Sequence, residues 1–446
     1  MAENKGQLKI PPRILGLLLS SLGAGVVPRV GASYIAIGRN EEISALAKDL
    51  QLAEQGGGAM RFIIGKYGSG KSFLLTLMKG YSMDKGFVAA ECDLSPERKL
   101  VATNGSGCST YRELMHNLST KTSPEGGALP SIISKWLSSI SMALVKDGYA
   151  PDTAEFSEEM RKKVFDLCSK LEGNVGGFDF AKVLHTYYTA SVNRDDEKKS
   201  YCMRWFFGEF ATKTEAKSVL RVSEIINDNN WYDYIKLWAV FFREIGYSGF
   251  AVFIDECVNL YKITNRVSRE KNYEKLLSMF NDTLGGRAEG LALFFGGTPQ
   301  FLEDGRRGLF SYEALRSRLA DGRYSGSTYK NLMGPVIRLR RMSDNELLAL
   351  VNRVTMLHES YHKSPVRITE DERISFCRMC LERAGADTMI TPREMIREYI
   401  TVLDIMLQNN ELSFEEILGK DGDRINLKSG KDDEIEIEGF EDFDDL

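Results

Sequence analysis

The sequence has few of the residues that define disulfide-rich proteins or zinc-binding domains. Its 446 residues include seven cysteines and four histidines. The cysteines are scattered, and only Cys377 and Cys380 lie close together, with no second pair that would complete a tetrahedral zinc site. This usage argues against a secreted disulfide scaffold, so we expect reduced thiols in a cytosolic protein.

Long hydrophobic runs are also missing. The apolar part of the N-terminal stretch RILGLLLSSLGAGVVPRVGA is too short to span a bilayer. Its apolar residues instead follow the spacing of an amphipathic helix. These residues are Ile14, Leu15, Leu18, Leu19 and Leu22. The pattern predicts a packed helical arm within residues 1–35, stopped by Pro28, and no membrane contact.

Positive charge is not concentrated anywhere in the chain. The formal net charge is −5, and residues 432–446 contain nine acidic residues and no basic ones. The rest of the chain is therefore mildly basic, but without the basic stripe typical of nucleic-acid-binding surfaces. The composition predicts an acidic, disordered tail over residues 419–446. Apolar residues between its charges, such as Ile435 and Phe440, leave open docking of the tail on a basic groove.

A glycine-rich loop is the clearest motif that is present. Residues 60–64, MRFII, indicate a buried strand; GKYGSGKS follows, and FLLTLMKGY then has a helical pattern. This order matches the phosphate-binding motif G-x-x-x-x-G-K-[ST], whose backbone N–H groups turn inward around phosphate oxygens at a helix N-terminus. Lys71 is expected to reach the β- and γ-phosphates of ATP, and Ser72 to hold Mg²⁺. The predicted nucleotide-binding residues are Gly65, Lys66, Tyr67, Gly68, Ser69, Gly70, Lys71 and Ser72.

A second apolar strand ends in two acidic residues. In GFAVFIDE, residues 249–256, four apolar residues precede Asp255 and Glu256. We expect Asp255 to hold Mg²⁺ through water and Glu256 to orient and deprotonate the attacking water. The alternative is that the two carboxylates merely cap a strand.

Two further apolar runs indicate more strands. LALFFGGTP, residues 291–299, ends near Thr298, which we expect to sense the γ-phosphate or position the lytic water. FVAAECDLS, residues 87–95, indicates a strand after the first helix. Strands that alternate with helices predict an α/β fold with a parallel sheet, whose carboxyl ends carry the motifs.

Three arginines are candidates for contact with phosphate. Arg316 and Arg318, in SYEALRSRLAD, have the fork geometry of an arginine finger for a neighbouring subunit, which implies a homo-oligomer. The alternative is that both are solvated surface arginines. Arg393 follows Thr391 and Pro392 in the first turn of a predicted helix, where its charge opposes the helix dipole. That placement indicates a nearby anion, either a nucleotide phosphate or a carboxylate.

With these motifs in this order, the sequence resembles an AAA+-type ATPase of the origin-recognition branch. IGRNEEI, residues 37–43, is similar to the segment beside the adenine in that group, which implies that Arg39 contacts the nucleotide. VIRLRRMSDNELLALV resembles the entry to the group's helical lid, and Arg393 matches its second sensor arginine. The resemblance implies a three-layer αβα sandwich with a C-terminal helical lid.

Longer blocks narrow the resemblance. RWFFGEFATKTEA and FFGGTPQFLEDGRRGLFSYEALRSRL are similar to the BrxD-like ATP-binding proteins of bacterial BREX phage-defence loci. Membership of that family implies an ATPase encoded beside an Lhr-like superfamily-2 helicase. Contact with DNA, either direct or through that helicase, is left open.

The expected domain organisation follows from the motif positions. Lys71 and Asp255 are much further apart than one or two βα units require, and residues 105–245 are helical and aromatic-rich, which predicts a large helical insertion. We expect its aromatics to lie in a core rather than on a nucleic-acid stacking surface. The expected domains are a helical arm (1–35), an ATPase core (36–335), a helical lid (336–418) and the tail (419–446).

One motif points to a different chemistry. Residues 358–362, HESYH, match the H-E-x-x-H pattern of zinc peptidases, in which two histidines bind the metal and the glutamate activates water. Neither His116 nor His185 is placed to complete such a site, although a Glu or Asp third ligand stays open. Because the phosphate-binding motifs explain more residues, we interpret His358 and His362 as helix-surface side chains and disfavour a peptidase.

The leading hypothesis is an ATPase that couples binding and hydrolysis of Mg·ATP to the action of a partner DNA helicase. The main alternative is a nucleotide-gated scaffold with little turnover that licenses assembly of a defence complex. A DNA-binding initiator is disfavoured, because roughly 30 residues follow the predicted lid, too few for a winged-helix domain.

Overall fold

The structure is a computed structural model that describes residues 10–102, 105–151, 153–321, 331–383 and 391–418. The chain divides into two compact units. The smaller unit comprises Met1–Ser44, Gly65–Leu77 and Arg338–Leu446, and the larger comprises Ala45–Ile64 and Met78–Ile337. Each unit has its own hydrophobic core and is described by itself. The predicted acidic tail lies outside the described residues, and the expected domain boundaries stay predictions.

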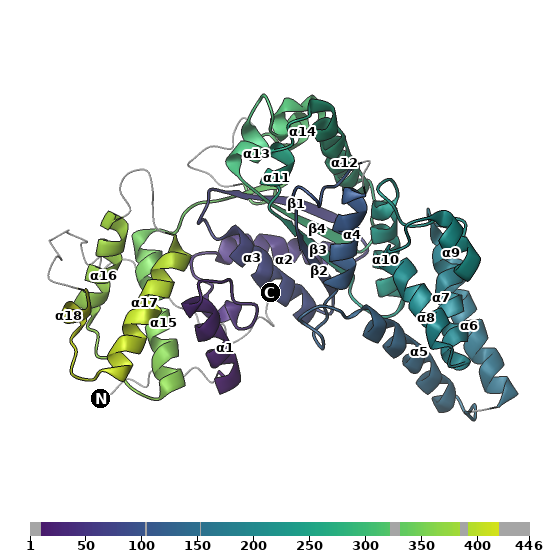
Figure 1. Cartoon of the computed structure of the whole chain (residues 1–446), viewed down its shortest axis with the longest axis horizontal. Coiled ribbons are helices and arrows are strands. Elements are labelled where there is room, and N and C mark those ends of the chain that lie inside the picture. Colours follow the sequence, from purple (N-terminus) through teal and green to yellow (C-terminus); the bar gives the residue numbers. More distant parts are fainter. Residues whose placement is uncertain (1–9, 103–104, 152, 322–330, 384–390, 419–446) are drawn as a thin grey trace. The chain divides into compact units, whose positions relative to one another are not determined.

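The larger unit is built around a parallel β-sheet (Figure 1). Its strands are β1 (Ala59–Gly65), β2 (Val88–Asp93), β3 (Phe250–Asp255), β4 (Leu291–Gly297) and β5 (Val336–Leu339). Within the described residues their order across the sheet is β2-β3-β4-β1-β5, and the pairs β2–β3, β3–β4 and β4–β1 are parallel. The predicted α/β class with a parallel sheet is therefore confirmed.

The central strands are buried along their whole length. Every residue of β1, β3 and β4 is buried, as expected for parallel strands that are covered on both faces. Helices pack on neighbouring strands, with α4 against β2 and α10 against β3. The register sets Ile64 of β1 beside Gly297 and Ile254 of β3 beside Phe295. The carboxyl ends of these strands thus lie at one edge of the sheet.

The chain between β2 and β3 is mainly helical. Its helices are α4 (Ser106–His116), α5 (Leu129–Lys146), α6 (Ala154–Glu172), α7 (Gly177–Val192), α8 (Asp196–Phe206), α9 (Lys213–Leu220) and α10 (Trp231–Glu244). Aromatic rings fill the interior: Trp238 stacks on Phe242 at 5.4 Å and meets Phe180 edge-on at 4.6 Å between ring centroids. All three rings are fully buried, which confirms that these aromatics form a core.

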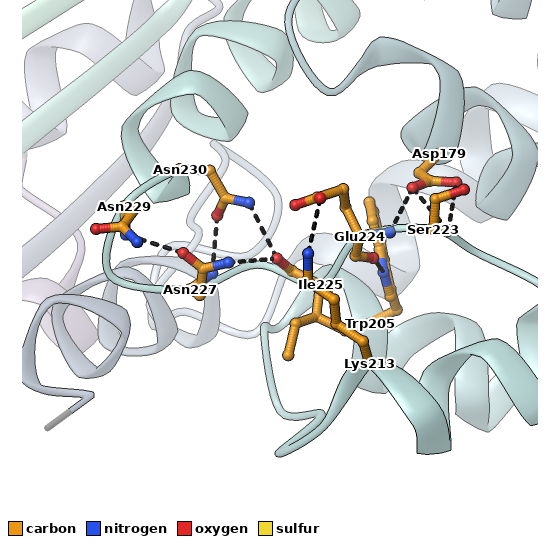
Figure 2. Close-up of polar contacts among 9 residues, drawn as sticks. All are labelled: Asp179, Trp205, Lys213, Ser223, Glu224, Ile225, Asn227, Asn229 and Asn230. Atoms are coloured by element: carbon orange, nitrogen blue, oxygen red, sulfur yellow. Dashed lines mark hydrogen bonds and ion pairs between the residues drawn. The ribbon is translucent and has the colours of Figure 1, made fainter. Parts of the chain in front are cut away.

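The irregular segment between α9 and α10 is held by side chains (Figure 2). Asp179 of α7 accepts hydrogen bonds from the backbone N–H groups of Ser223 and Glu224, and the indole of Trp205 donates to the carbonyl of Glu224. Asn230 donates to the carbonyl of Ile225 just ahead of α10. These bonds satisfy backbone groups that no helix or strand pairs, and they fix how the chain enters α10.

Further helices, of very different lengths, follow β3 and β4 in the larger unit. They are α11 (Val258–Tyr261), α12 (Arg266–Leu284), α13 (Pro299–Glu303), η2 (Leu309–Ser311) and α14 (Glu313–Leu319). Two helices begin in the smaller unit and end in the larger one, namely α2 (Asn40–Glu54) and α3 (Lys71–Asp84).

The smaller unit has an aliphatic helical core. Its remaining elements are α1 (Pro12–Gly23), η1 (Ala32–Ile35), α15 (Asp344–His362), α16 (Glu370–Arg383), α17 (Pro392–Gln408) and α18 (Phe414–Leu418). The leucines of α1 are buried in this core, and α1 packs against α15 and α17. The amphipathic N-terminal helix is confirmed. Among the described helices, none has the length and apolarity needed to cross a membrane.

All seven cysteines are buried. Burial raises the pKa of the Cys168, Cys202 and Cys377 thiols to about 12. These groups are therefore protonated at neutral pH and are poor nucleophiles.

Candidate functional site

The glycine-rich loop joins the end of β1 to the N-terminus of α3. The loop turns back on itself through the N–H of Ser69, which donates to the carbonyl of Lys66 at 3.1 Å. Gly68 and Gly70 have φ angles of +75° and +84°, a backbone region that favours glycine. The two glycines thus allow the tight turn that the motif requires.

Lys71 stands at the start of α3 and points back along the loop. Its Nζ donates to the carbonyls of Gly65 at 3.0 Å and Lys66 at 3.3 Å. The ammonium group is therefore held close to the loop, at the helix N-terminus. There it could donate hydrogen bonds to the oxygens of a bound phosphate. Ser72 is the next residue of α3 and is partly buried.

The loop leaves room for a ligand. Apart from its two chain neighbours, no atom of the described residues would lie within 4 Å of a Cβ built at Gly70. The loop and the first residues of α3 supply backbone N–H groups, the ammonium of Lys71 and the hydroxyl of Ser72, which are groups suited to phosphate or, for the hydroxyl, to Mg²⁺. The residues present fit a nucleotide phosphate chain.

Arg39 is buried beneath the loop, with 5% of its surface exposed. Its Nη2 donates to the carbonyl of Ser69 at 2.9 Å and to that of Arg340 at 2.6 Å, and Nη1 lies 3.7 Å from Glu42. Burial lowers the pKa of Arg39, yet a guanidinium stays charged at any physiological pH. In the structure Arg39 therefore stabilises the loop through the carbonyl of Ser69. Its predicted contact with the nucleotide stays a prediction.

The chain that follows β5 continues this network. Arg340 forms two hydrogen bonds with Glu346, of 2.6 and 2.7 Å, and Glu346 also closes the capping box of α15 with Ser343. Burial tends to raise the pKa of Glu346, but hydrogen bonds from Arg340 and Ser343 outweigh it and lower that pKa. Arg39 and Arg340 thus connect the loop to the start of α15.

The N-terminus of α17 contacts the loop as well. A Cβ built at Gly68 would lie 2.9 Å from Cγ2 of Thr391, the N-cap residue of this helix. Thr391 and Glu394 form a capping box at this helix start. Arg393 lies exposed in this first turn, two residues from the contact with the loop. The structure thus brings the turn that carries Arg393 to the glycine-rich loop.

The predicted acidic pair lies at the end of β3 in the larger unit. Asp255 is buried, whereas Glu256 is exposed and adopts a left-handed backbone with φ of +57°. This conformation is uncommon for a residue with a side chain and is held by the N–H of Glu256, which donates to Oδ1 of Asp255 at 2.8 Å. The next N–H, of Cys257, donates to the carbonyl of Gly296 on β4.

A third carboxylate lies beside this pair. Asp93 ends β2 directly opposite Asp255 in the parallel register. Although Asp93 keeps contact with solvent, partial desolvation and repulsion from Asp255 and Glu256 raise its pKa. We did not predict Asp93 from the sequence; the signal was present, because FVAAECD ends an apolar strand in an acid just as FAVFID does.

Thr298 follows β4 and begins the short helix α13. Its hydroxyl oxygen accepts a hydrogen bond from the N–H of Phe301 at 3.3 Å. The register places this residue at the same edge of the sheet as the ends of β1 and β3. Its hydroxyl proton is still available for donation, and its role as a sensor stays a prediction.

The two arginines of α14 differ in their surroundings. Arg318 donates to Oδ1 of Asn281 at 3.2 Å and to the carbonyl of Ala314 at 2.7 Å. Arg316 is exposed, and its ion pair with Glu313 is long, at 3.9 Å. Of the two guanidinium groups, that of Arg316 is therefore less committed to its own subunit, as far as the described residues show.

The histidines of HESYH do not both lie on the surface. His362 is exposed, but His358 is 2% exposed, so the expectation that both are surface side chains was wrong for His358. The helix period alone could not show this, because α17 covers that face of α15. Glu359 accepts a hydrogen bond from the N–H of Val366 at 2.9 Å, which gives it a structural role in the turn after α15.

A parallel sheet whose first strand runs through a glycine-rich loop into a helix N-terminus is typical of P-loop nucleotide-binding proteins. The comparisons agree with that class. The family model described as BREX system ATP-binding protein BrxC/D matches residues 10–422, and the chain belongs to this family. The resemblance to the BrxD-like ATP-binding proteins is confirmed, and ATP is the nucleotide that the family binds. No curated protein matches the chain.

Proposed function

We propose that this BREX ATP-binding protein hydrolyses Mg·ATP and that the cycle rearranges the helices of its smaller unit. One observation supports this most directly: Thr391 at the start of α17 touches Gly68, while Arg39 and Arg340 tie the same loop to α15. A loop that adjusts to a phosphate chain therefore acts on both helices at once.

The proposed roles divide between holding the nucleotide and moving a proton. Lys71 and the loop N–H groups hold the triphosphate, and Ser72 and Asp255 hold Mg²⁺, which when bound offsets the negative charge of the phosphates. Glu256 orients the attacking water and accepts its proton. The exposed carboxylate and constrained backbone of Glu256 support this assignment.

Thr298 and Arg393 are proposed to report on the γ-phosphate. Thr298 would donate its hydroxyl proton from the end of β4, and Arg393 would supply positive charge from the first turn of α17. Because Arg393 is close in sequence to the contact between Thr391 and Gly68, its interaction with an anion is the simplest way to pull α17 toward the loop.

Two substitutions test hydrolysis. We expect Lys71→Ala to abolish ATP binding, and Glu256→Gln to keep binding while turnover falls at least 100-fold. Binding is measured by calorimetry and turnover by phosphate release, with Lys146→Ala, an exposed lysine of α5, as the matched control. Equal turnover in wild type and Glu256→Gln would remove Glu256 from the proposed role. Stable ATP binding with negligible turnover under all conditions would favour the nucleotide-gated scaffold instead.

The partners are proposed on the family alone. We propose action with an Lhr-like superfamily-2 helicase, and contact with DNA either directly or through it. Co-purification with that helicase in the presence and absence of ATP, followed by mass measurement, tests the partnership. ATP turnover is then measured with DNA, with helicase and with both. Stimulation by either addition would indicate a motor, and unchanged low turnover would indicate a nucleotide-gated switch.

A homo-oligomer with a shared site is the last part of the proposal. If Arg316 completes a neighbour's site, Arg316→Ala lowers turnover without weakening ATP binding, and the loss exceeds that of Arg318→Ala. The weaker commitment of Arg316 to its own subunit supports this order. A larger loss with Arg318→Ala would reverse the assignment.

A further inference from the structure

A cluster of metal-ligating side chains in the smaller unit lies apart from the glycine-rich loop. His358 and His362 stand one turn apart near the end of α15, with ring centroids 4.4 Å apart. Asp404, on α17, lies 3.0 Å from Nε2 of His358 through its Oδ1. One ligand atom from each of the three residues lies within 4.8 Å of the others.

The hydrogen bonding of His358 is incomplete within the described residues. Nε2 faces Asp404, but the buried Nδ1 has no hydrogen-bond partner there. A buried ring nitrogen without a partner is energetically unfavourable and uncommon in folded proteins. If Nε2 binds a cation, the neutral imidazole carries its proton on Nδ1, so Nε2 and the carboxylate of Asp404 can both act as ligands on the same side of the ring.

We infer that His358, His362 and Asp404 form a binding site for a divalent cation of the Zn²⁺ class. Two imidazoles and one carboxylate are a donor set that favours zinc and its transition-metal neighbours over Mg²⁺ or Ca²⁺, which prefer oxygen. Tetrahedral zinc with ligands at about 2.0–2.1 Å brings donor atoms to about 3.4 Å from one another. The three donors already lie within 4.8 Å of one another, and two of the side chains, His362 and Asp404, are not fully buried and can adjust toward that spacing.

The site serves structure rather than peptide hydrolysis. Glu359, the residue that would activate water in a peptidase, is bonded to the N–H of Val366. The cation instead joins the last turns of α15 to α17. Along α17, Asp404 and the Thr391 end that touches Gly68 are separated by about 20 Å of helix. The cation would therefore stiffen the helix pair on which the glycine-rich loop acts.

The test uses full-length protein freed of metal by a chelator. We expect calorimetry with ZnCl₂ to show one equivalent bound, and His362→Ala to weaken binding at least tenfold. His362 is the key variant because it is exposed, so its loss does not perturb the core. Asp404→Asn should also weaken binding, whereas the control His116→Ala, an exposed histidine of the larger unit, should bind zinc as wild type does.

Two further measurements separate the outcomes. Co²⁺ bound to wild type should give the visible spectrum of a site with nitrogen ligands, and Glu359→Gln should leave zinc affinity unchanged. Equal zinc binding by wild type and His362→Ala, or no zinc bound by wild type at 100-fold molar excess, would overturn the inference. None of these measurements depends on ATP turnover, so the site stands or falls separately from the proposed ATPase.

Discussion

The two units of the chain differ in how their buried polar side-chain atoms are hydrogen-bonded. In the larger unit, the indoles of Trp231 and Trp238 donate to the carbonyl of Leu100 and the hydroxyl of Tyr111. In the smaller unit, the buried Oγ of Ser69 and Nδ1 of His358 have no hydrogen-bond partner within the described residues. Within the described residues such atoms also occur on Tyr232, Arg269 and Arg307 of the larger unit, and on Asn352, Arg373 and Arg378 of the smaller one. In the smaller unit, two of these atoms, Ser69 Oγ and His358 Nδ1, thus lie at the two places where we propose ligands, the glycine-rich loop and the histidine cluster.

The largest expected effect is on the completed core of the larger unit. Trp238 is fully buried among Phe180, Phe241 and Phe242. Trp238→Ala should lower the free energy of unfolding by about 3–5 kcal/mol, because it leaves a cavity and removes the hydrogen bond that the indole donates to the Tyr111 hydroxyl oxygen. Denaturant titration measures the change. Phe165→Ala, at an exposed position of α6, is the control and should cost under about 0.5 kcal/mol.

A smaller loss is expected where a buried cation supports the loop. Arg39→Met leaves the carbonyls of Ser69 and Arg340 without their donor, which should cost about 2–3 kcal/mol of unfolding free energy and weaken ATP binding about tenfold. The control is Arg367→Met, since Arg367 also donates to a carbonyl, that of Asn410, but is exposed. If both variants lose the same free energy of unfolding, the buried hydrogen bonds of Arg39 contribute no more to stability than the exposed one of Arg367.

Contact between the loop and α17 is tested by a single methyl group. Gly68→Ala should destabilise the protein by about 1–2 kcal/mol, because the residue needs a left-handed backbone and its Cβ would meet Cγ2 of Thr391. Adding Thr391→Ser removes that methyl group while keeping the N-cap hydroxyl. The double variant should recover part of the lost stability in a thermal melt. No recovery would mean that backbone strain alone accounts for the loss.

The smallest effect is a pH dependence. The folded pKa of Glu346 is below its ordinary value of 4.5, so its contribution is fully present above pH 4.5 and is lost as the pH falls through the folded pKa. We expect less than about 1 kcal/mol, because Arg340 is half exposed to solvent. Glu346→Gln should flatten that part of the stability curve measured by denaturation between pH 3 and 6. An unchanged slope would show that other carboxylates dominate.

Much of the fold could be predicted because its signals are local. The strands that carry Asp255 and Thr298 are continuous apolar runs, and the loop before Lys71 has glycine where the backbone needs it. The short β5, VIRL, was not predicted as a strand, because four residues that include Arg338 do not stand out from the helix entry that follows.

What could not be predicted depends on contacts between distant segments. His358 lies under α17, and its neighbour Asp404 is on a different helix, so no pattern within HESYH could show either fact. Asp93 likewise becomes interesting only once the register places it opposite Asp255. Arg39 was assigned by resemblance, and only the structure shows that its guanidinium reaches the carbonyl of Ser69.

The buried cysteines allow the opening of each core to be measured by thiol labelling. Cys92, Cys168, Cys202 and Cys257 are part of the larger core, and Cys377 and Cys380 are part of the smaller one. A maleimide can react with these sulfurs only while the surrounding packing is open. Peptide mapping of labelled protein over time therefore yields separate opening rates for the two cores. Repeating it with ATP would show in which core ATP slows the opening.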